Sequence, residues 1–252
     1  MSCPARTGPP RIDKYRHTAI GLGLAACVIA GWLVLHVGAI FFYQWGWHSL
    51  ITAPIIVALG CWLYVGLFIV SHDCMHGSLA PFRPKLNAVI GKLCMLLYAG
   101  FDYDRLNRSH HRHHRYSGTE EDPDFDFRPP HDFGKWYLKF LLEYFGLREF
   151  AILSAAVTIY IGILGVGLIN LIAFWTVPAI LSSLQLFYFG TYLPHCPGDD
   201  VFTDRHRTRS TAYNWWFSLL TCFHFGYHHE HHLFPEMPWW RLPEVRQRTV
   251  QK

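Results

Sequence analysis

The segment LITAPIIVALGCWLYVGLFIVSHDCMH, residues 50–76, joins an apolar run to two histidines at its end. The run Leu50–Ser71 contains no charged residue, and about 20 apolar residues are enough for a helix to cross the hydrocarbon core of a bilayer. His72 and His76 are four residues apart, so both lie on one face of a helix. The segment therefore predicts a membrane span that ends in two candidate metal ligands.

Three further apolar runs have spanning length: Thr18–Phe42, Phe150–Phe174 and Trp175–Leu193. The composition agrees, because 51% hydrophobic and 16% charged residues are unusual for a soluble globular protein. The shorter run Leu86–Tyr98 is interrupted by Lys92 and predicts a helix that lies against or dips into the membrane interface. We expect an all-α integral membrane protein with four transmembrane helices (18–42, 50–71, 150–174 and 175–193) in two hairpins, short interfacial helices and a cytoplasmic cap that carries the histidines.

The basic residues support this arrangement. All 22 Lys and Arg fall in the regions Arg6–Arg16, Arg83–Arg148 and Arg205–Lys252, and none lies between Phe42 and Ser49 or near Phe174. By the positive-inside tendency, both termini and the histidine clusters should face the cytoplasm, in a bacterial inner membrane. The net charge of +4 is compatible with anionic lipid, and the basic residues form no nucleic-acid-binding motif.

The chain shows neither an internal repeat nor a low-complexity linker, so residues 1–252 are expected to form a single domain. Its first apolar segment is too long for a usual signal peptide and is interpreted as a retained span. The seven cysteines contain no CxxC pair, which argues against a zinc ribbon or a disulfide framework.

Two more histidine clusters follow the first, and each has the pattern HxxHH. Rings three and four residues apart share a helix face, and neutral imidazole is the commonest metal ligand in proteins. Eight such rings exceed the needs of one ion, so the sequence predicts a two-metal site at one membrane face. Its expected ligands are His72, His76, His110, His113, His114, His228, His231 and His232.

His195, in GTYLPH at the end of the last run, is expected to be a ninth ligand, because an ionisable group at the membrane edge needs a partner. His111 and His229 are out of phase with the helical pattern and should face away from the metals. The position of His224, four residues before His228, stays open. The isolated histidines are interpreted as packing or loop residues: His17, His36, His48, His131 and His206.

The ligand type leaves zinc and copper open, although an all-imidazole site with open positions suits iron and O2 activation. A zinc-protease HExxH motif is excluded, because position 233 is Leu233. A metal carrier would place its ligands along the spans, whereas these clusters are expected at one membrane face, which argues against a carrier. Carboxylates near the clusters are expected to hold the histidine tautomers by hydrogen bonds, with solvated charge or helix capping as the alternative for each: Asp73, Asp104, Asp122, Asp124 and Glu230.

Several longer motifs resemble the membrane-bound fatty acid desaturase/hydroxylase superfamily and, within it, the bacterial β-carotene ketolases. They are SHDCMHGSLAP, SHHRHHRYSGTEEDPDFDF, LPHCP, DRHRTRS and LLTCFHFGYHHEHHLFPEMPWWRLP. The resemblance runs from the second apolar run to near the C-terminus. It implies two iron ions held by the eight clustered histidines, and a further family histidine that matches His195.

The resemblance also implies the reaction, which is oxidation of C4 of a β-ionone ring to a ketone, from β-carotene to echinenone and canthaxanthin. Two successive hydroxylations of one carbon would consume O2 and electrons from an external donor such as ferredoxin. A carotenoid ring hydroxylase or a membrane lipid desaturase remains the alternative, because these enzymes share the histidine spacing.

A carotenoid is about as long as the membrane is thick, so it should enter from the lipid phase. Aromatic residues close to the histidines in sequence are expected to line an apolar slot for it. The alternative for each is packing between helices or anchoring at the interface. These residues are Phe101, Tyr103, Phe187, Tyr188, Phe189, Tyr192, Phe223, Phe225 and Tyr227.

Overall fold

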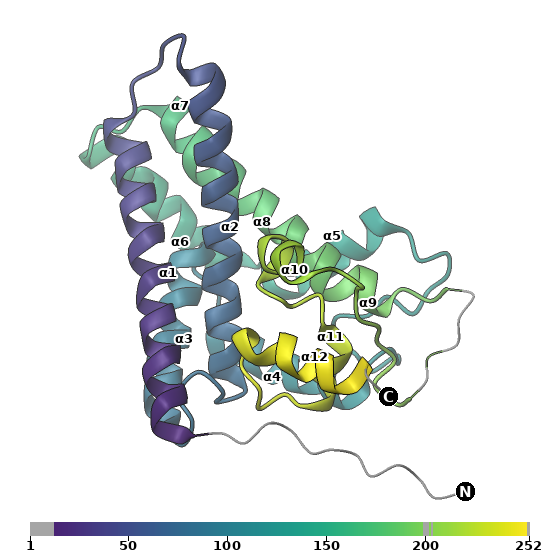
Figure 1. Cartoon of the computed structure of the whole chain (residues 1–252). Coiled ribbons are helices and arrows are strands. Elements are labelled where there is room, and N and C mark those ends of the chain that lie inside the picture. Colours follow the sequence, from purple (N-terminus) through teal and green to yellow (C-terminus); the bar gives the residue numbers. More distant parts are fainter. Residues whose placement is uncertain (1–12, 199–201, 203, 251–252) are drawn as a thin grey trace, which may run out of the picture.

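The computed structural model describes residues 13–198, 202 and 204–250, and every regular element within these ranges is a helix (Figure 1). Two long helices, α1 (Lys14–Phe42) and α2 (Ser49–Met75), form the hairpin expected from the first two apolar runs. The Asp13 carboxylate caps α1 by accepting hydrogen bonds from the Tyr15 and Arg16 amides. The prediction of an all-α protein with helices of membrane-spanning length is confirmed.

Helix α3 (Pro84–Ala99) runs antiparallel to the end of α2. The Ser71 hydroxyl donates to the Gly91 carbonyl at 3.2 Å, and the rings of Tyr64 and Tyr98 meet edge to face. Gly91 is required here, because a β carbon at this position would lie 2.1 Å from the Tyr103 ring. The expected interfacial segment is thus a helix that packs along α2.

The boundary between the third and fourth predicted spans is wrong. Helix α6 (Leu147–Thr158) continues through a π-helical turn to Ile163, and the chain reverses between residues 164 and 167, where Gly165 has a φ of +67°. Phe174 and Trp175 lie inside the next continuous helix, Leu168–His195. Hydropathy alone could not show this break, because both sides of the turn are equally apolar. No Lys or Arg lies near the corrected turn either.

Three helices in the described ranges are long and apolar enough to cross a membrane: Lys14–Phe42, Ser49–Met75 and Leu168–His195. The third consists of α7 (Leu168–Leu171), α8 (Val177–Phe187) and α9 (Leu193–His195), joined by π-helical turns. A fourth span results if α5 (Phe133–Tyr144) and Leu147–Ile163 are counted together, although the two are bent by 80°.

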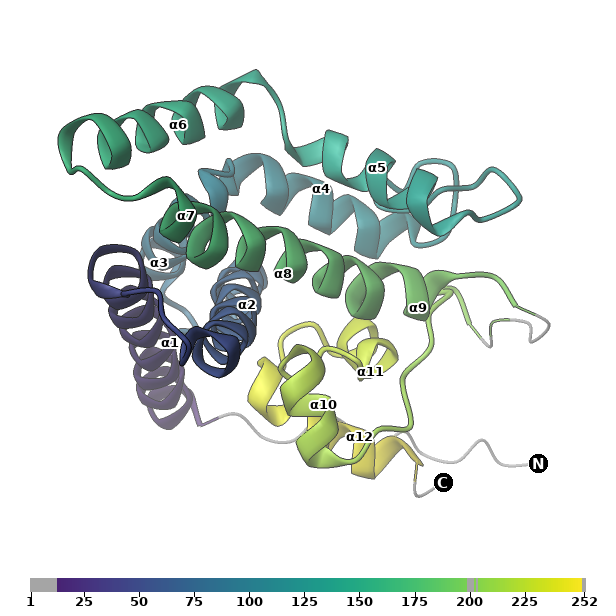
Figure 2. The ribbon, with the colours of Figure 1, turned by 90° about the horizontal axis from the view of Figure 1, so that it is seen from above.

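The helix from α7 to α9 crosses the middle of the molecule, with α4, α5 and α6 on one side of it (Figure 2). On the other side lie α1, α2 and the C-terminal helices. The Asp73 carboxylate at the end of α2 accepts a hydrogen bond from the Trp239 amide at 3.1 Å, which ties the C-terminal segment to α2. The remaining helices are α4 (Tyr103–Tyr116), α10 (Trp215–Cys222), α11 (His228–Leu233) and α12 (Leu242–Val250).

Candidate metal centre

Four helices bring nine histidine rings together at the end of the molecule opposite the α1–α2 connection. The end of α2, helix α4, α9 and α11 each contribute at least one ring. The rings divide into two sets, and within each set the candidate ligand atoms all lie within 4.8 Å of one another. The first set is His72, His76, His110, His114 and His231, and the second is His113, His195, His228 and His232. All nine histidines expected from the sequence belong to one of the two sets.

The spacing of the ring nitrogens fits metal coordination. Nε2 of His110 lies 2.7 Å from Nε2 of His76 and 3.1 Å from that of His114. Ligand atoms about 2.1 Å from one ion and about 90° apart are separated by about 3 Å. An imidazole nitrogen carries either a proton or a free lone pair. Nε2 of His110 therefore cannot donate a hydrogen bond to one of these neighbours and accept one from the other. A cation at the centre of the set satisfies these lone pairs together.

The HxxHH pattern divides each cluster between the two sets. In α4, His110 and His114 belong to the first set, and His113 belongs to the second. In α11 the allocation is reversed, because His228 and His232 share the second set. Residues four apart therefore belong to the same set, and the intervening histidine belongs to the other set. The two sets adjoin, since the rings of His114 and His232 stack with centroids 4.1 Å apart.

Burial favours the neutral form of five of the clustered imidazoles, and the neutral ring is the form that binds a metal. Removal from water is the largest cause that lowers the pKa of these rings well below the ordinary value of histidine, and neighbouring histidines lower it further. The rings outside the membrane-length helices to which this applies are His110, His114, His228, His231 and His232. Nε2 of His72 is also buried and has no hydrogen-bond partner within the described residues, as a metal-binding nitrogen would.

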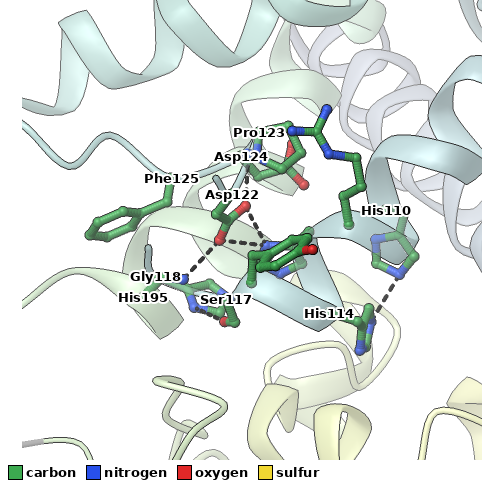
Figure 3. Close-up of polar contacts among 12 residues, drawn as sticks. His110, His114, Ser117, Gly118, Asp122, Pro123, Asp124, Phe125 and His195 are labelled. Carbon is green, nitrogen blue, oxygen red and sulfur yellow. Dashed lines mark hydrogen bonds and ion pairs between the residues drawn. The ribbon is translucent and has the colours of Figure 1, made fainter. Parts of the chain in front are cut away.

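Asp122 holds the ring of His113, and Figure 3 shows the Asp122 carboxylate with its second partner, Gly118. Both carboxylate oxygens lie 3.0 Å from Nδ1 of His113, and the Gly118 amide donates to Asp122 at 2.9 Å. Burial acts to lower the pKa of His113, but the Asp122 charge and hydrogen bond outweigh it and raise this pKa. Burial acts to raise the pKa of Asp122, which His113 and the Gly118 amide lower instead. The ionised carboxylate fixes the proton on Nδ1 and leaves Nε2 for a metal.

We predict that Asp122→Asn lowers metal occupancy at the second set and lowers turnover about 10- to 100-fold, because the amide no longer holds His113 as an anion does. The measurements are metals per purified chain and product formation. Asp104→Asn is the matched control, since Asp104 forms an exposed ion pair with Lys92 at 2.9 Å. Equal metal content in the two variants would contradict the assigned role of Asp122.

Two of the five expected carboxylate partners form their contacts away from the histidine rings. Asp104 pairs with Lys92 at the surface, and its position in the first turn of α4 explains it as a helix-terminus charge. Glu230 points away from the rings and accepts hydrogen bonds from Arg246 at 2.7 Å and Thr249 at 3.0 Å. Both expectations were wrong because proximity in sequence does not set the direction of a side chain on a helix.

The other two carboxylates are close to the sets without a hydrogen bond to a ligand ring in the described residues. Asp73 lies 3.8 Å from Nδ1 of His72 and bonds the Trp239 amide instead. Asp124 is buried near His113 and accepts a hydrogen bond from the Tyr144 hydroxyl.

The two histidines expected to face away from the metals belong to neither set. His111 is exposed and its Nδ1 contacts the Asn107 carbonyl at 3.0 Å, while Nε2 of His229 contacts Asp204 at 2.9 Å. His224 is buried with its ring beside Trp215, outside both sets. The isolated histidines also lie outside the sets: His17, His36, His48, His131 and His206.

Three consecutive hollows lead from the histidines toward the outer surface between α3, α5, α6 and α8. The inner hollow is bounded by four histidines, by Asp124 and Thr191 and by mostly apolar side chains; the histidines are His72, His110, His113 and His228. It shares Phe68, Leu106, Phe140, Tyr144 and Leu186 with a middle hollow. The middle hollow in turn shares Tyr98, Phe101, Tyr137, Leu141 and Ser183 with an outer one. The inner two have volumes of about 40 Å³ each and the outer about 450 Å³, so the passage narrows toward the rings.

Of the aromatic residues expected to line a slot, Phe101 and Phe225 border these hollows. The others pack elsewhere: Tyr103 against Gly91, Phe187 beside Trp136, Tyr188 and Tyr192 beside Phe133, Phe189 beside Tyr213, Phe223 on Trp62, and Tyr227 on His224. Phe68 and Leu106 also line the hollows, although the sequence pattern did not single them out. Each stands four residues before a clustered histidine, His72 or His110, and this spacing places it on the same helix face.

Comparison of the sequence with known proteins identifies the family of this chain. The fatty acid desaturase family matches residues 45–153 and 147–252. A beta-carotene ketolase of Paracoccus sp. (strain N81106 / MBIC 01143) is 49% identical over 236 residues, covering 93% of this chain and 96% of the relative. A beta-carotene ketolase of Paracoccus sp. (strain PC1) is 50% identical over 230 residues, 91% and 93% of the two chains.

More distant relatives fall in the same group. The zeaxanthin 4-ketolase of Chlamydomonas reinhardtii is 36% identical over 251 residues, which cover 95% of this chain and 55% of that protein. The chain therefore belongs to the fatty acid desaturase family, and within it to the group of the beta-carotene ketolases.

Proposed function

We propose that this protein is a β-carotene 4-ketolase, a membrane oxygenase that converts C4 of the β-ionone ring to a ketone. The observation that carries the proposal is the identity of about half of the residues with two beta-carotene ketolases over more than nine-tenths of the chain. The two histidine sets and the apolar hollows that end at them support the same activity.

The nine histidines would hold two iron ions, five rings at one and four at the other. When bound, the iron pair would supply O2 activation and oxidation of the allylic C4–H bond. The chain fixes the rings through helical spacing and through hydrogen bonds such as the one that His113 donates to the Asp122 carboxylate. His195 is held similarly, since its Nδ1 contacts the Arg207 carbonyl at 2.9 Å and leaves Nε2 for a metal.

The hollows would present the ring carbon. The outer hollow has an apolar lining and lies against the membrane-length helix, so a polyene can enter from lipid without passing through water. The inner hollow is narrow, and a six-membered ring requires side chains such as Phe68 and Phe225 to rotate as it enters. Close packing around the ring then selects the carbon that faces the histidines.

The overall change replaces the two hydrogens of C4 by one oxygen. Each hydroxylation takes one O2, two electrons and two protons, inserts one oxygen atom into a C–H bond and releases one water. The second hydroxylation gives a geminal diol, which loses water to form the ketone. An external donor, for which an acidic ferredoxin is our candidate, would supply the electrons.

The charge distribution supports a cytoplasmic position for the histidine sets and both termini in a bacterial inner membrane. The corrected turn at residues 164–167 and the α1–α2 connection both lack Lys and Arg, and the positive-inside tendency favours the opposite side for these connections. Residues 1–252 would act as one domain, because the two sets draw ligands from α2 through α11.

The expected result in bacterial cells that accumulate β-carotene is formation of echinenone and canthaxanthin after expression of this chain. Extracted pigments are identified by chromatography and mass spectrometry, and cells with an empty vector are the control. Exclusive formation of 3-hydroxylated carotenoids would favour the ring hydroxylase instead. Unchanged carotenoids with altered membrane lipids would favour a lipid desaturase.

A further inference from the structure

The face of α4 opposite the clustered histidines is exposed and basic. Arg108, His111, Arg112 and Arg115 recur at spacings that place them along one side of the helix, and we call them the α4 cationic face. Arg108 and Arg115 form no hydrogen bond or ion pair within the described part of the chain, and Arg112 donates to the backbone carbonyl of Glu121 at 3.3 Å. The chain therefore leaves these charges available to a partner.

This face reaches the first histidine set through His111. The exposed ring of His111 stacks on the ring of His76 with centroids 5.6 Å apart and an angle of 27° between the planes. His76 belongs to the first set, and its Nε2 lies 2.7 Å from that of His110. One imidazole therefore separates the surface of α4 from a candidate metal ligand.

A second basic surface meets His76 from another side. An open hollow of about 430 Å³ is lined by His76 with Lys14 and Arg83, and also by Glu236. The first set thus approaches the surface at His76, between these two cations and the α4 cationic face. The nearest acidic residue on α4 itself is Asp104, whose charge is balanced by Lys92.

We propose that the α4 cationic face docks a small soluble electron carrier with an acidic surface, and that electrons enter the first set through the stacked rings of His111 and His76. This inference rests on the proposed function, in which every hydroxylation draws two electrons from outside the chain. Electron transfer slows steeply with distance, so a carrier must bind where the surface is closest to the metals. The exposed arginines of α4 lie there and complement a negative partner.

Binding is measured with an acidic [2Fe–2S] ferredoxin and the full chain in nanodiscs of phosphatidylcholine alone, at low ionic strength. Arg108→Glu/Arg112→Glu/Arg115→Glu should raise the Kd at least about tenfold, and salt should weaken wild-type binding. Arg115→Glu alone should raise the Kd, whereas its matched control Lys135→Glu, an exposed cation on α5, should not. Because this readout is binding, it remains decisive even if the chain forms no ketone.

An unchanged Kd for the triple variant overturns the proposal. If the reversals weaken association with phosphatidylglycerol vesicles and leave ferredoxin binding unaltered, the face recognises lipid phosphate and the proposal is likewise wrong. At saturating ferredoxin, His111→Ala should slow reduction of the metal centre, followed by its absorbance, and His111→Phe should restore part of the rate by keeping a stacked ring. If both variants are reduced as fast as the wild type, His111 is not part of the electron route.

Discussion

His113→Ala and His231→Ala should each abolish ketone formation, by more than about 100-fold, which exceeds the usual effect of losing an outer hydrogen-bond partner. Each should also remove one of two bound metals. The reason is that His113 belongs to the second histidine set and His231 to the first. Within the described part of the chain, neither set contains a further histidine that could replace the lost ring, and oxidation at one carbon would need both ions.

The two variants are compared by metals per purified chain and by ketocarotenoid formed in β-carotene-producing cells. His48→Ala is the matched control, because His48 is exposed at the α1–α2 connection and contacts the Gln44 carbonyl. The double variant should be no less active than either single variant, since the ligands act as a unit. Two metals per chain in His231→Ala would remove that ring from the ligand set.

Helical periodicity made most of the grouping of the histidine rings predictable. The spacing of His110, His113 and His114 places these rings on one side of α4, and the structure has them there. The allocation of individual rings could not be predicted, because it depends on how α4 crosses α11. The contribution of His195 depends on the end of a helix that contains a π-helical turn, Tyr188–Tyr192, which shifts the phase of the residues after it.

The direction of individual side chains could not be predicted from the sequence. Asp122 and Glu230 are both close to clustered histidines in sequence, yet Asp122 bonds His113 and Glu230 bonds Arg246. The reversal of the chain at Gly165 was likewise hidden, because apolar runs on both sides of a tight turn have the same hydropathy. These features depend on tertiary packing, which periodicity and composition do not encode.

Leu186→Trp should lower ketone formation on the order of 100-fold without loss of metal, because misplacing the substrate by a small distance is sufficient for such an effect. Leu186 borders both the inner and the middle hollow, and its side chain is 6% exposed. These hollows hold about 40 Å³ each, so an indole at this position would occupy the passage to the histidines. The added bulk should cost about 1–3 kcal/mol of stability.

Leu181→Trp is the matched control, since Leu181 lies on the same helix but is 42% exposed. Both variants are purified, their bound metals are counted, and their ketocarotenoid yields are compared at equal protein. Loss of product in Leu186→Trp with two metals retained identifies the hollows as the substrate route, because the metal centre is then intact. Full activity in this variant would place the route elsewhere, and loss of metal would show that Leu186 supports the histidine sets rather than the passage.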